Sequence, residues 1–255
     1  MSGDRRLIVN ADDFGRSPGI NRAIIDCHAG GIVSSTTLMV NLPWTGEAVA
    51  LWRAHPSLGL GLHLNFCYGT PVSDPNAVPS LVDREGYFVT DTCWLAANAS
   101  PDDVVRETQS QLERFVQLVG RWPTHLDSHK YLHSAGRVRD AVIDVAAQHR
   151  LPVRAATDED RSAIKAAGLQ TTDRFESRFH GLDGIGVSRE VLATALRDMT
   201  EGVTELMCHP GYVDEHIQDS SYAADREREV DALTAPEIRV LIDQLGIRLI
   251  TFADI

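Results

Sequence analysis

Short apolar segments alternate with amphipathic segments along the whole chain. The apolar segments are four to seven residues long and rich in β-branched and large aliphatic residues. They predict seven strands, at 7–11, 36–40, 58–64, 123–127, 152–155, 204–208 and 247–252. Because segments of helical period separate these strands, we expect crossover connections and a mostly parallel sheet.

The clearest predicted helix is 101–120. Acidic residues occupy its first turn, apolar residues form a stripe, and Gly120 ends it shortly before Pro123. Ser188 can cap another helix, with Glu190 in its first turn. The remaining predictions place helices at 137–149, 188–200 and 235–245.

Seven alternating strands can close into a barrel or remain an open, doubly wound sheet. We expect a distorted parallel (β/α) TIM-like barrel in a single domain over residues 1–255, a length that one domain can reach. The segments 66–100 and 157–186 do not fit the alternation. We predict that both are long loops over one face, where function often resides.

Composition disfavours several classes of partner. The 255 residues include 36 acidic and 24 basic side chains, a formal net charge of −12. This excess of acid argues against binding nucleic acid or an anionic membrane surface. No apolar run approaches the roughly 18 residues of a membrane span, and the first residues do not resemble a secretory signal. We therefore expect no membrane insertion and a cytoplasmic location.

The cysteines carry no pairing signal. They are isolated, without a CxxC pair, so neither a zinc ribbon nor a disulfide scaffold is predicted and a reducing compartment is expected. A homodimer is compatible with this sequence, which does not decide the oligomeric state. The four positions are Cys27, Cys67, Cys93 and Cys208.

Two adjacent carboxylates follow the first predicted strand, in the segment NADDFG. Asp12 and Asp13 would lie at the carboxyl end of that strand, the edge at which α/β folds bind ligands. A turn or a helix cap is the alternative, since aspartate is favoured in both.

Histidines also lie at the ends of two further predicted strands. His63 lies in GLHLN, and THLDSHKYLH contains His125, His129 and His133 at four-residue spacing. If this second segment is extended, the two-residue period places Asp127 on the same side as His125 and His129, where it can orient a histidine ligand. Ordinary core histidines and polar loop packing are the alternatives.

A fourth strand end carries His209, in ELMCHPGY, where the following proline favours extended backbone. A structural role is the alternative. Taken together, the four strand ends present aspartate, histidine, histidine and histidine. Two histidines and one carboxylate are typical of an open, catalytic metal site. A second carboxylate as general base and a further histidine as general acid suit hydrolysis of an amide or ester.

These blocks, with STT and REREVDAL, resemble the YdjC-like carbohydrate deacetylases, which include chitooligosaccharide deacetylase. The matching blocks run in family order from residue 7 to about 234. The resemblance implies a distorted parallel (β/α) barrel, one divalent metal ion and removal of N-acetyl groups from amino sugars or oligosaccharides.

The resemblance also implies roles for individual residues. The metal ligands would be Asp13, His63 and His129. Asp12 would be the general base that acts on water, and His209 the general acid that protonates the departing amine.

This chain departs from its relatives in the third block, which often reads DSHHHVH. Lys130 and Tyr131 replace the two middle histidines, whereas His129 and the distal His133 are retained. The ligand histidine is therefore preserved, while substrate contacts or the metal preference can differ. His133 remains a candidate for binding substrate.

Two arginines and several aromatic residues are further candidates for the substrate site. Arg154 and Arg226 would orient Asp12 or bind sugar oxygens, with a structural ion pair as the alternative. Aromatic side chains in 66–100 can stack on sugar rings or pack in the core. These aromatic candidates are Phe66, Tyr68, Tyr87, Phe88 and Trp94.

Other functions remain open at the level of the sequence. The protein could be another metal-dependent hydrolase, such as a phosphoesterase or an amidohydrolase-like enzyme, or a sugar-binding module without turnover. A two-histidine, one-carboxylate iron oxygenase is disfavoured because its usual jelly roll does not alternate strands with helices. Neither the acetylated substrate nor the choice between Zn²⁺ and Mg²⁺ follows from the sequence.

Overall fold

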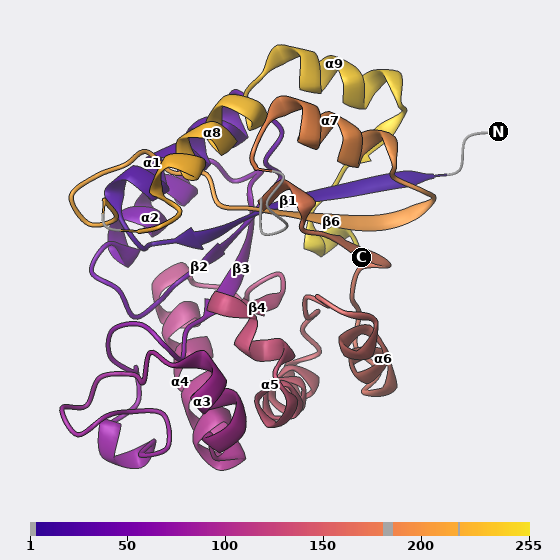
Figure 1. Ribbon diagram of the computed structural model, residues 1–255. Coiled ribbons are helices and arrows are strands. Elements are labelled where there is room, and N and C mark those ends of the chain that lie inside the picture. The colour runs from indigo at the N-terminus through magenta and orange to yellow at the C-terminus, as the bar shows by residue number, and fades with distance from the viewer. Residues whose placement is uncertain (1–3, 181–185, 219) are drawn as a thin grey trace.

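A seven-stranded parallel sheet forms the centre of the protein (Figure 1). The computed structural model describes residues 4–180, 186–218 and 220–255. Along the sheet the order is β4-β3-β2-β1-β6-β5, and β7 also pairs with β1. The strands are β1 (Arg5–Phe14), β2 (Ser35–Leu38), β3 (Gly59–Leu64), β4 (Leu126–Ser128), β5 (Arg174–Glu176), β6 (Gly202–Cys208) and β7 (Ile247–Leu249).

The sheet curves into a half-barrel. Each of the strand pairs is parallel. Within the described residues no ladder joins β4 to β5, the two ends of the strand order. The predicted α/β fold with a distorted parallel barrel is thus confirmed, as an incomplete barrel. Because all seven strands run in the same direction, their carboxyl ends still lie at one edge of the sheet, where α/β folds bind ligands.

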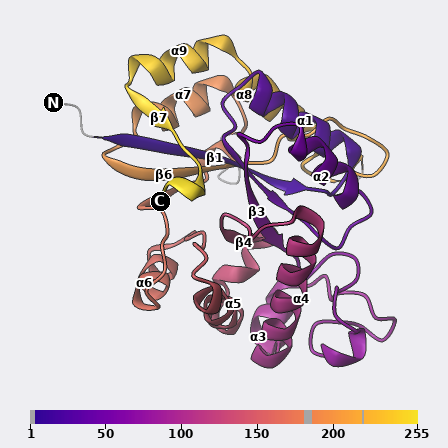
Figure 2. The same cartoon turned by 180° about the vertical axis from the view of Figure 1, so that it is seen from behind.

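Helices cover both sides of β1. In the two opposite views, α1, α2 and α7 to α9 lie on one side and α3 to α6 on the other (Figures 1 and 2). None of the described helices is long and apolar enough to cross a membrane. The helices are α1 (Pro18–Ala29), α2 (Thr45–Arg53), α3 (Thr92–Asn98), α4 (Pro101–Val119), α5 (Gly136–His149), α6 (Asp158–Ala166), α7 (Arg189–Arg197), α8 (Ala223–Leu233) and α9 (Pro236–Gln244).

The helix ends that the sequence predicts are present. After α4, Gly120 adopts φ 87°, a left-handed conformation that glycine takes without strain. At the start of α7, Ser188 accepts a hydrogen bond from the backbone N–H of Val191. Helices α4, α5, α7 and α9 match the four predicted helices to within a few residues.

The predicted strand at 152–155 is wrong. There the chain makes only a single bridge, between Val153 and Leu126 of β4. The Leu126 N–H donates to the Pro152 carbonyl, and the Leu126 carbonyl accepts from the Arg154 N–H, after which the chain leaves the sheet toward α6. Arg154, next to this bridge, is completely buried.

The two predicted long loops contain regular structure. Segment 66–100 ends with α3, which Asp91 caps. Segment 157–186 contains α6 and β5, while 181–185 lie outside the described residues. The charged residues at the start of that segment form a capping box, in which Thr157 and Asp160 bond each other's backbone N–H. The charge that suggested a loop therefore marks the start of a helix.

Candidate active site

The adjacent carboxylates lie where β1 ends. In a regular strand, Asp12 and Asp13 would point to opposite faces. Asp13, however, has φ 71°, and the pairing of β1 with β2 shifts register between Ala11 and Phe14. Aspartate tolerates this left-handed conformation better than most residues. The irregularity allows both carboxylates to line the same cavity.

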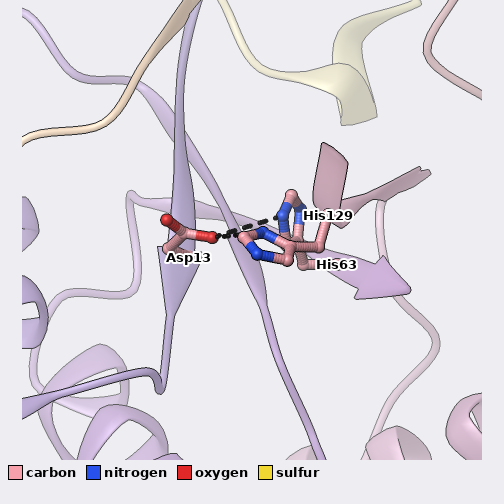
Figure 3. Close-up of side chains that lie close together, drawn as sticks. All are labelled: Asp13, His63 and His129. Carbon is pink, nitrogen blue, oxygen red and sulfur yellow. Dashed lines mark ion pairs between the residues drawn. The ribbon is translucent and has the colours of Figure 1, made fainter. Parts of the chain in front are cut away.

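Asp13 meets two histidines from different parts of the chain (Figure 3). Its Oδ1 lies 3.0 Å from Nδ1 of His129 and 3.5 Å from Nε2 of His63. Two ligand atoms of one tetrahedral zinc ion lie about 3.3 Å apart, given bonds of about 2.0–2.1 Å. Oδ1 is also buried, and no described residue is its hydrogen-bond partner. This donor set, with its unpartnered oxygen, fits a divalent metal ion.

His63 is held from the neighbouring strand. The register of β3 and β4 places it opposite Asp127, whose Oδ1 lies 2.8 Å from Nδ1 of His63. Thr37 donates a hydrogen bond to the other oxygen of Asp127. Burial opposes a charge on His63, but Asp127 raises its pKa above the usual value. With Nδ1 engaged in this way, Nε2 is left to face Asp13.

Two arginines bind the second oxygen of Asp13. Oδ2 accepts hydrogen bonds from Arg226 and from Arg16, the latter at 3.2 Å. Burial opposes ionisation of Asp13, but Arg226, with His129 and Arg16, holds its pKa well below the usual range. Asp13 is therefore an anion with one oxygen anchored and the other directed at the histidines.

A buried arginine holds the other carboxylate of the pair. Nη1 and Nη2 of Arg154 each lie 2.7 Å from one oxygen of Asp12, and Asn10 donates a further hydrogen bond at 2.9 Å. Burial would raise the pKa of Asp12, but the Arg154 guanidinium lowers it far below its ordinary value. Bidentate pairing fixes the orientation of this carboxylate as well as its charge.

The Arg154 guanidinium contacts three carboxylates at once. Besides Asp12 it contacts Asp127 at 3.0 Å and Glu205 at 2.7 Å, and all four residues are buried. One guanidinium cannot neutralise three anions. Accordingly, burial and the charges of Asp127 and Asp12 raise the pKa of Glu205 to about 7, although Arg154 opposes the rise.

His209 lies on the other side of Asp12. Its Nε2 is 3.8 Å from Oδ2 of Asp12, and burial lowers its pKa well below the usual range. The cavity onto which these side chains open has a volume of about 670 Å³, and Arg226 lines it too. The structure thus brings Asp12 and His209 together with the three metal-ligand candidates, Asp13, His63 and His129.

The remaining residues of the third block and Arg154 have different surroundings. Lys130 and Tyr131 line the cavity, and both have positive φ, 53° and 55°. His133 and Arg154 are buried and do not line it. The Nδ1 atom of His133 is hydrogen-bonded to Ser128 at 2.7 Å. Arg154 forms a bidentate ion pair with Asp12, which is the structural alternative named above and is also compatible with the predicted role of orienting Asp12.

His125 belongs to the core. Its ring stacks on Phe252 with centroids 3.6 Å apart. It also passes so close to Gly61 that a Cβ atom there would lie 2.4 Å from the ring. The first glycine of GLHLN therefore makes room for this histidine, and Asp127 orients His63 instead of a histidine of its own segment.

The aromatic candidates divide by exposure. Phe66 and Phe88 are buried in the core, whereas Tyr68, Tyr87 and Trp94 are exposed. Among these, Tyr68 lies against Arg16, which lines the cavity. Tyr68 is thus the aromatic candidate that the structure connects to the site.

Several residues around the cavity were missed by sequence reasoning. Arg16 and Thr37 contact the central side chains, and their only sequence signal is proximity to NADDFG and membership of STT. His180 and Tyr222 line the cavity from segments without a recognisable signal. Tertiary structure alone brings these two beside His209.

Fold and site together define an α/β half-barrel protein with a candidate metal centre, an adjacent carboxylate and histidine, Asp12 and His209, and an open cavity. The family model of YdjC-like proteins matches residues 6–244. The chain therefore belongs to the YdjC-like family.

Similar proteins extend over nearly the whole chain. A carbohydrate deacetylase of Brevibacillus brevis is 40% identical and covers 98% of this chain and 99% of its own. A chitooligosaccharide deacetylase of Serratia marcescens is 38% identical, covering 99% of this chain and 100% of its own. A crystal structure from Enterococcus faecalis V583 is 31% identical, covers 98% of both chains and has a TM-score of 0.91.

Proposed function

We propose that this protein is a metal-dependent carbohydrate deacetylase that hydrolyses the acetamide of an amino sugar. The observation that carries the proposal is the convergence of Asp13, His63 and His129 beside Asp12 and His209 at one cavity. The deacetylase names of relatives that align over nearly the full chain support it.

Asp13, His63 and His129 would hold the metal ion, and Asp127 would keep His63 in the tautomer that offers Nε2. When bound, a divalent ion lowers the pKa of water and polarises a carbonyl oxygen. Two imidazoles with a carboxylate suit Zn²⁺, while Mg²⁺ favours oxygen ligands. The family relationship is compatible with either ion.

Asp12 would accept the proton of the attacking water. Its carboxylate is always ionised at neutral pH because Arg154 stabilises the anion. The same stabilisation makes it a weak base, so it gives up an acquired proton readily. His209 would receive that proton once the 3.8 Å between its Nε2 and Oδ2 of Asp12 shortens to hydrogen-bond distance in the substrate complex.

His209 would then protonate the departing amine. Burial keeps its imidazole neutral at rest. A proton that arrives through Asp12 during the reaction converts it to a strong acid beside the leaving nitrogen. The water proton and the amine proton are then one and the same, and no proton from bulk solvent is required in this step.

The volume and the polar lining of the cavity are compatible with a sugar-sized substrate. Its volume of about 670 Å³ lies in the range of small-molecule sites. Polar side chains that include Arg226 and Ser221 line it, and these can bind hydroxyl groups. The names of the relatives point to acetylated sugars and chitooligosaccharides as the substrate class.

Acetate release tests the proposal. The purified protein, loaded with Zn²⁺ or with Mg²⁺, is incubated with N-acetylglucosamine and its β-1,4 oligomers, and acetate is quantified. We expect release that stops with a chelator and returns when metal is restored. Sugar binding without acetate would support a binding module, and hydrolysis of phosphate esters alone would support a phosphoesterase. Either result would overturn the proposal.

A further inference from the structure

A second group of candidate metal-ligand side chains includes two histidines that line the same cavity, His180 and His209, and a buried glutamate, Glu229. His180, His209 and Glu229 each place one ligand atom within 4.8 Å of the other two. His180 ends a short 3₁₀ helix (Arg178–His180), His209 follows β6, and Glu229 projects from α8. No residue of this group belongs to the Asp13 cluster.

The two imidazoles of this group have unmet bonding capacity. Nδ1 of His180 and Nδ1 of His209 are buried, and neither has a hydrogen-bond partner among residues 4–180, 186–218 and 220–255. The rings lie face to face, tilted by 36°, with centroids 4.2 Å apart. Buried polar atoms without partners are rare in folded proteins and call for an explanation such as an ion.

The Glu229 carboxylate lies beside these rings. It is fully buried, and its Oε1 accepts a hydrogen bond from the Tyr222 hydroxyl at 2.5 Å. Nδ1 of His180 lies 3.8 Å from the same oxygen, too far for a hydrogen bond. That distance slightly exceeds the roughly 3.3 Å between two ligands of one zinc ion. A small closing movement would let both atoms bind one ion.

The alternative is that this group simply packs around the general acid. Packing explains the ring contact, and the hydrogen bond from the His209 backbone N–H to Glu229 explains one carboxylate oxygen. Packing does not explain two buried imidazole nitrogens without partners beside a fully buried carboxyl. Two histidines, one glutamate and an opening to solvent are the composition of a zinc site.

We infer that His180, His209 and Glu229 form a second, weaker site for a transition-metal ion such as Zn²⁺, and that an ion there inhibits the enzyme by occupying the general acid. The inhibitory part rests on the proposed function, whereas the binding part does not. The site is weaker than the Asp13 site because its ligand atoms are further apart and must close around the ion.

Inhibition follows from the chemistry of imidazole. A ring that binds a metal through either nitrogen cannot become an imidazolium, so His209 would lose the protonated form that serves the departing amine. Loss of a general acid lowers turnover by about 10²–10⁴-fold. Mg²⁺ prefers oxygen ligands and keeps its water, so it should not bind between two imidazoles.

Counting bound zinc tests the binding part. Metal-free protein is dialysed against increasing Zn²⁺, and the zinc per chain is measured. We expect two equivalents for the natural protein, one tight and one weak. His180→Ala should keep only the tight equivalent, and this retained equivalent itself shows that the variant is folded. His63→Ala should keep only the weak one.

His216→Ala is the matched control, since His216 lines the same cavity outside the group. It should keep both equivalents. A single equivalent in the natural protein, or two in both His180→Ala and His180→Asn, would overturn the second site.

The ratio of acetate release in excess zinc to that at one equivalent tests the inhibitory part. In the natural protein, acetate release in excess zinc should be about 10²-fold or more lower than at one equivalent. In His180→Ala the ratio of the two should stay near one. Excess Mg²⁺ should leave it unchanged. If two equivalents bind but no acetylated sugar is hydrolysed, the proposed function fails and the site stands. If turnover is normal and only one equivalent binds, the site fails and the function stands.

Discussion

Arg154 grips both carboxylate oxygens of Asp12, with Nη1–Oδ2 and Nη2–Oδ1 distances of 2.7 Å each. Both side chains are buried. The pair fixes where the anion points and keeps it ionised. The carboxylate proposed as general base is thus positioned by a residue that never reaches the cavity.

Arg154→Lys should damage this arrangement without removing the positive charge. Lysine cannot bind two oxygens in a fixed plane, so Asp12 loses its orientation and kcat should fall about 10²-fold. Arg154 lowers the pKa of Asp12, so a poorer partner raises that pKa. The acidic limb of the kcat/KM profile should then move to higher pH. Arg228→Lys, at the more exposed ion pair with Asp225 on α8, is the control. An unchanged profile would contradict the role of Arg154.

The two adjacent aspartates should separate by metal content. Asp12→Asn and His209→Ala should keep the tight metal equivalent and lower kcat about 10²–10⁴-fold, because each removes a proton-transfer group. Asp13→Ala should lose metal, because its Oδ1 faces both histidines. Elemental analysis and acetate release on the same samples provide the two readouts. Metal loss in Asp12→Asn with retention in Asp13→Ala would exchange the two roles.

Asp127→Asn should weaken metal binding about 10–100-fold, the usual effect of losing the acceptor behind a histidine ligand. The amide can no longer accept the hydrogen bond of His63 Nδ1 as strongly, so Nε2 is presented less well. Competition with a chromophoric chelator measures the affinity. Asp140→Asn, at an exposed position of α5, should have no effect. Equal affinities for the two variants would show that Asp127 does not act through His63.

Glu205 should make folding stability depend on pH. Burial raises its pKa to about 7, above the ordinary 4.5. Between these values the folded protein keeps a proton that the unfolded chain releases. This carboxyl therefore costs stability as pH rises from about 4.5 through 7. Glu205→Gln carries no such proton and should show a smaller loss over that interval.

Melting temperatures of both proteins, measured in chelator from pH 4.5 to 7.5, check this prediction. The chelator removes differences in metal loading. Curves that fall in parallel would mean that Glu205 is ionised throughout, with Arg154 fully compensating its burial.

How much of the site the sequence predicts depends on how local its signals are. Asp13, His63 and His129 lie at or just after the ends of predicted strands, which meet at a common edge, and their roles as ligands came from the resemblance to the YdjC-like family. His180 and Tyr222 have no such signal. They reach His209 through the packing of a 3₁₀ helix and α8 against β6, which only long-range contacts determine.

The fold shows the same division. Helices such as α4 were predicted because caps and apolar periodicity are local. The strand expected at 152–155 failed because a short β-rich run pairs only where a neighbour is available, and Val153 finds just one bridge. In the same way, the charged start of α6 was mistaken for a loop although it is a capping box.

By itself, the sequence determined that strands alternate with helices, that acidic and histidine side chains follow the strands, and that these blocks are those of the YdjC-like family. Only the tertiary structure decided that the sheet stops at a half-barrel and that Arg154 binds Asp12. It also decided that the carboxylates of the adjacent residues Asp12 and Asp13 line the same cavity. The reason is physical: periodicity and caps are properties of neighbouring residues, whereas charge pairing and strand register arise between segments that are distant in the sequence, such as Asp12 and Arg154.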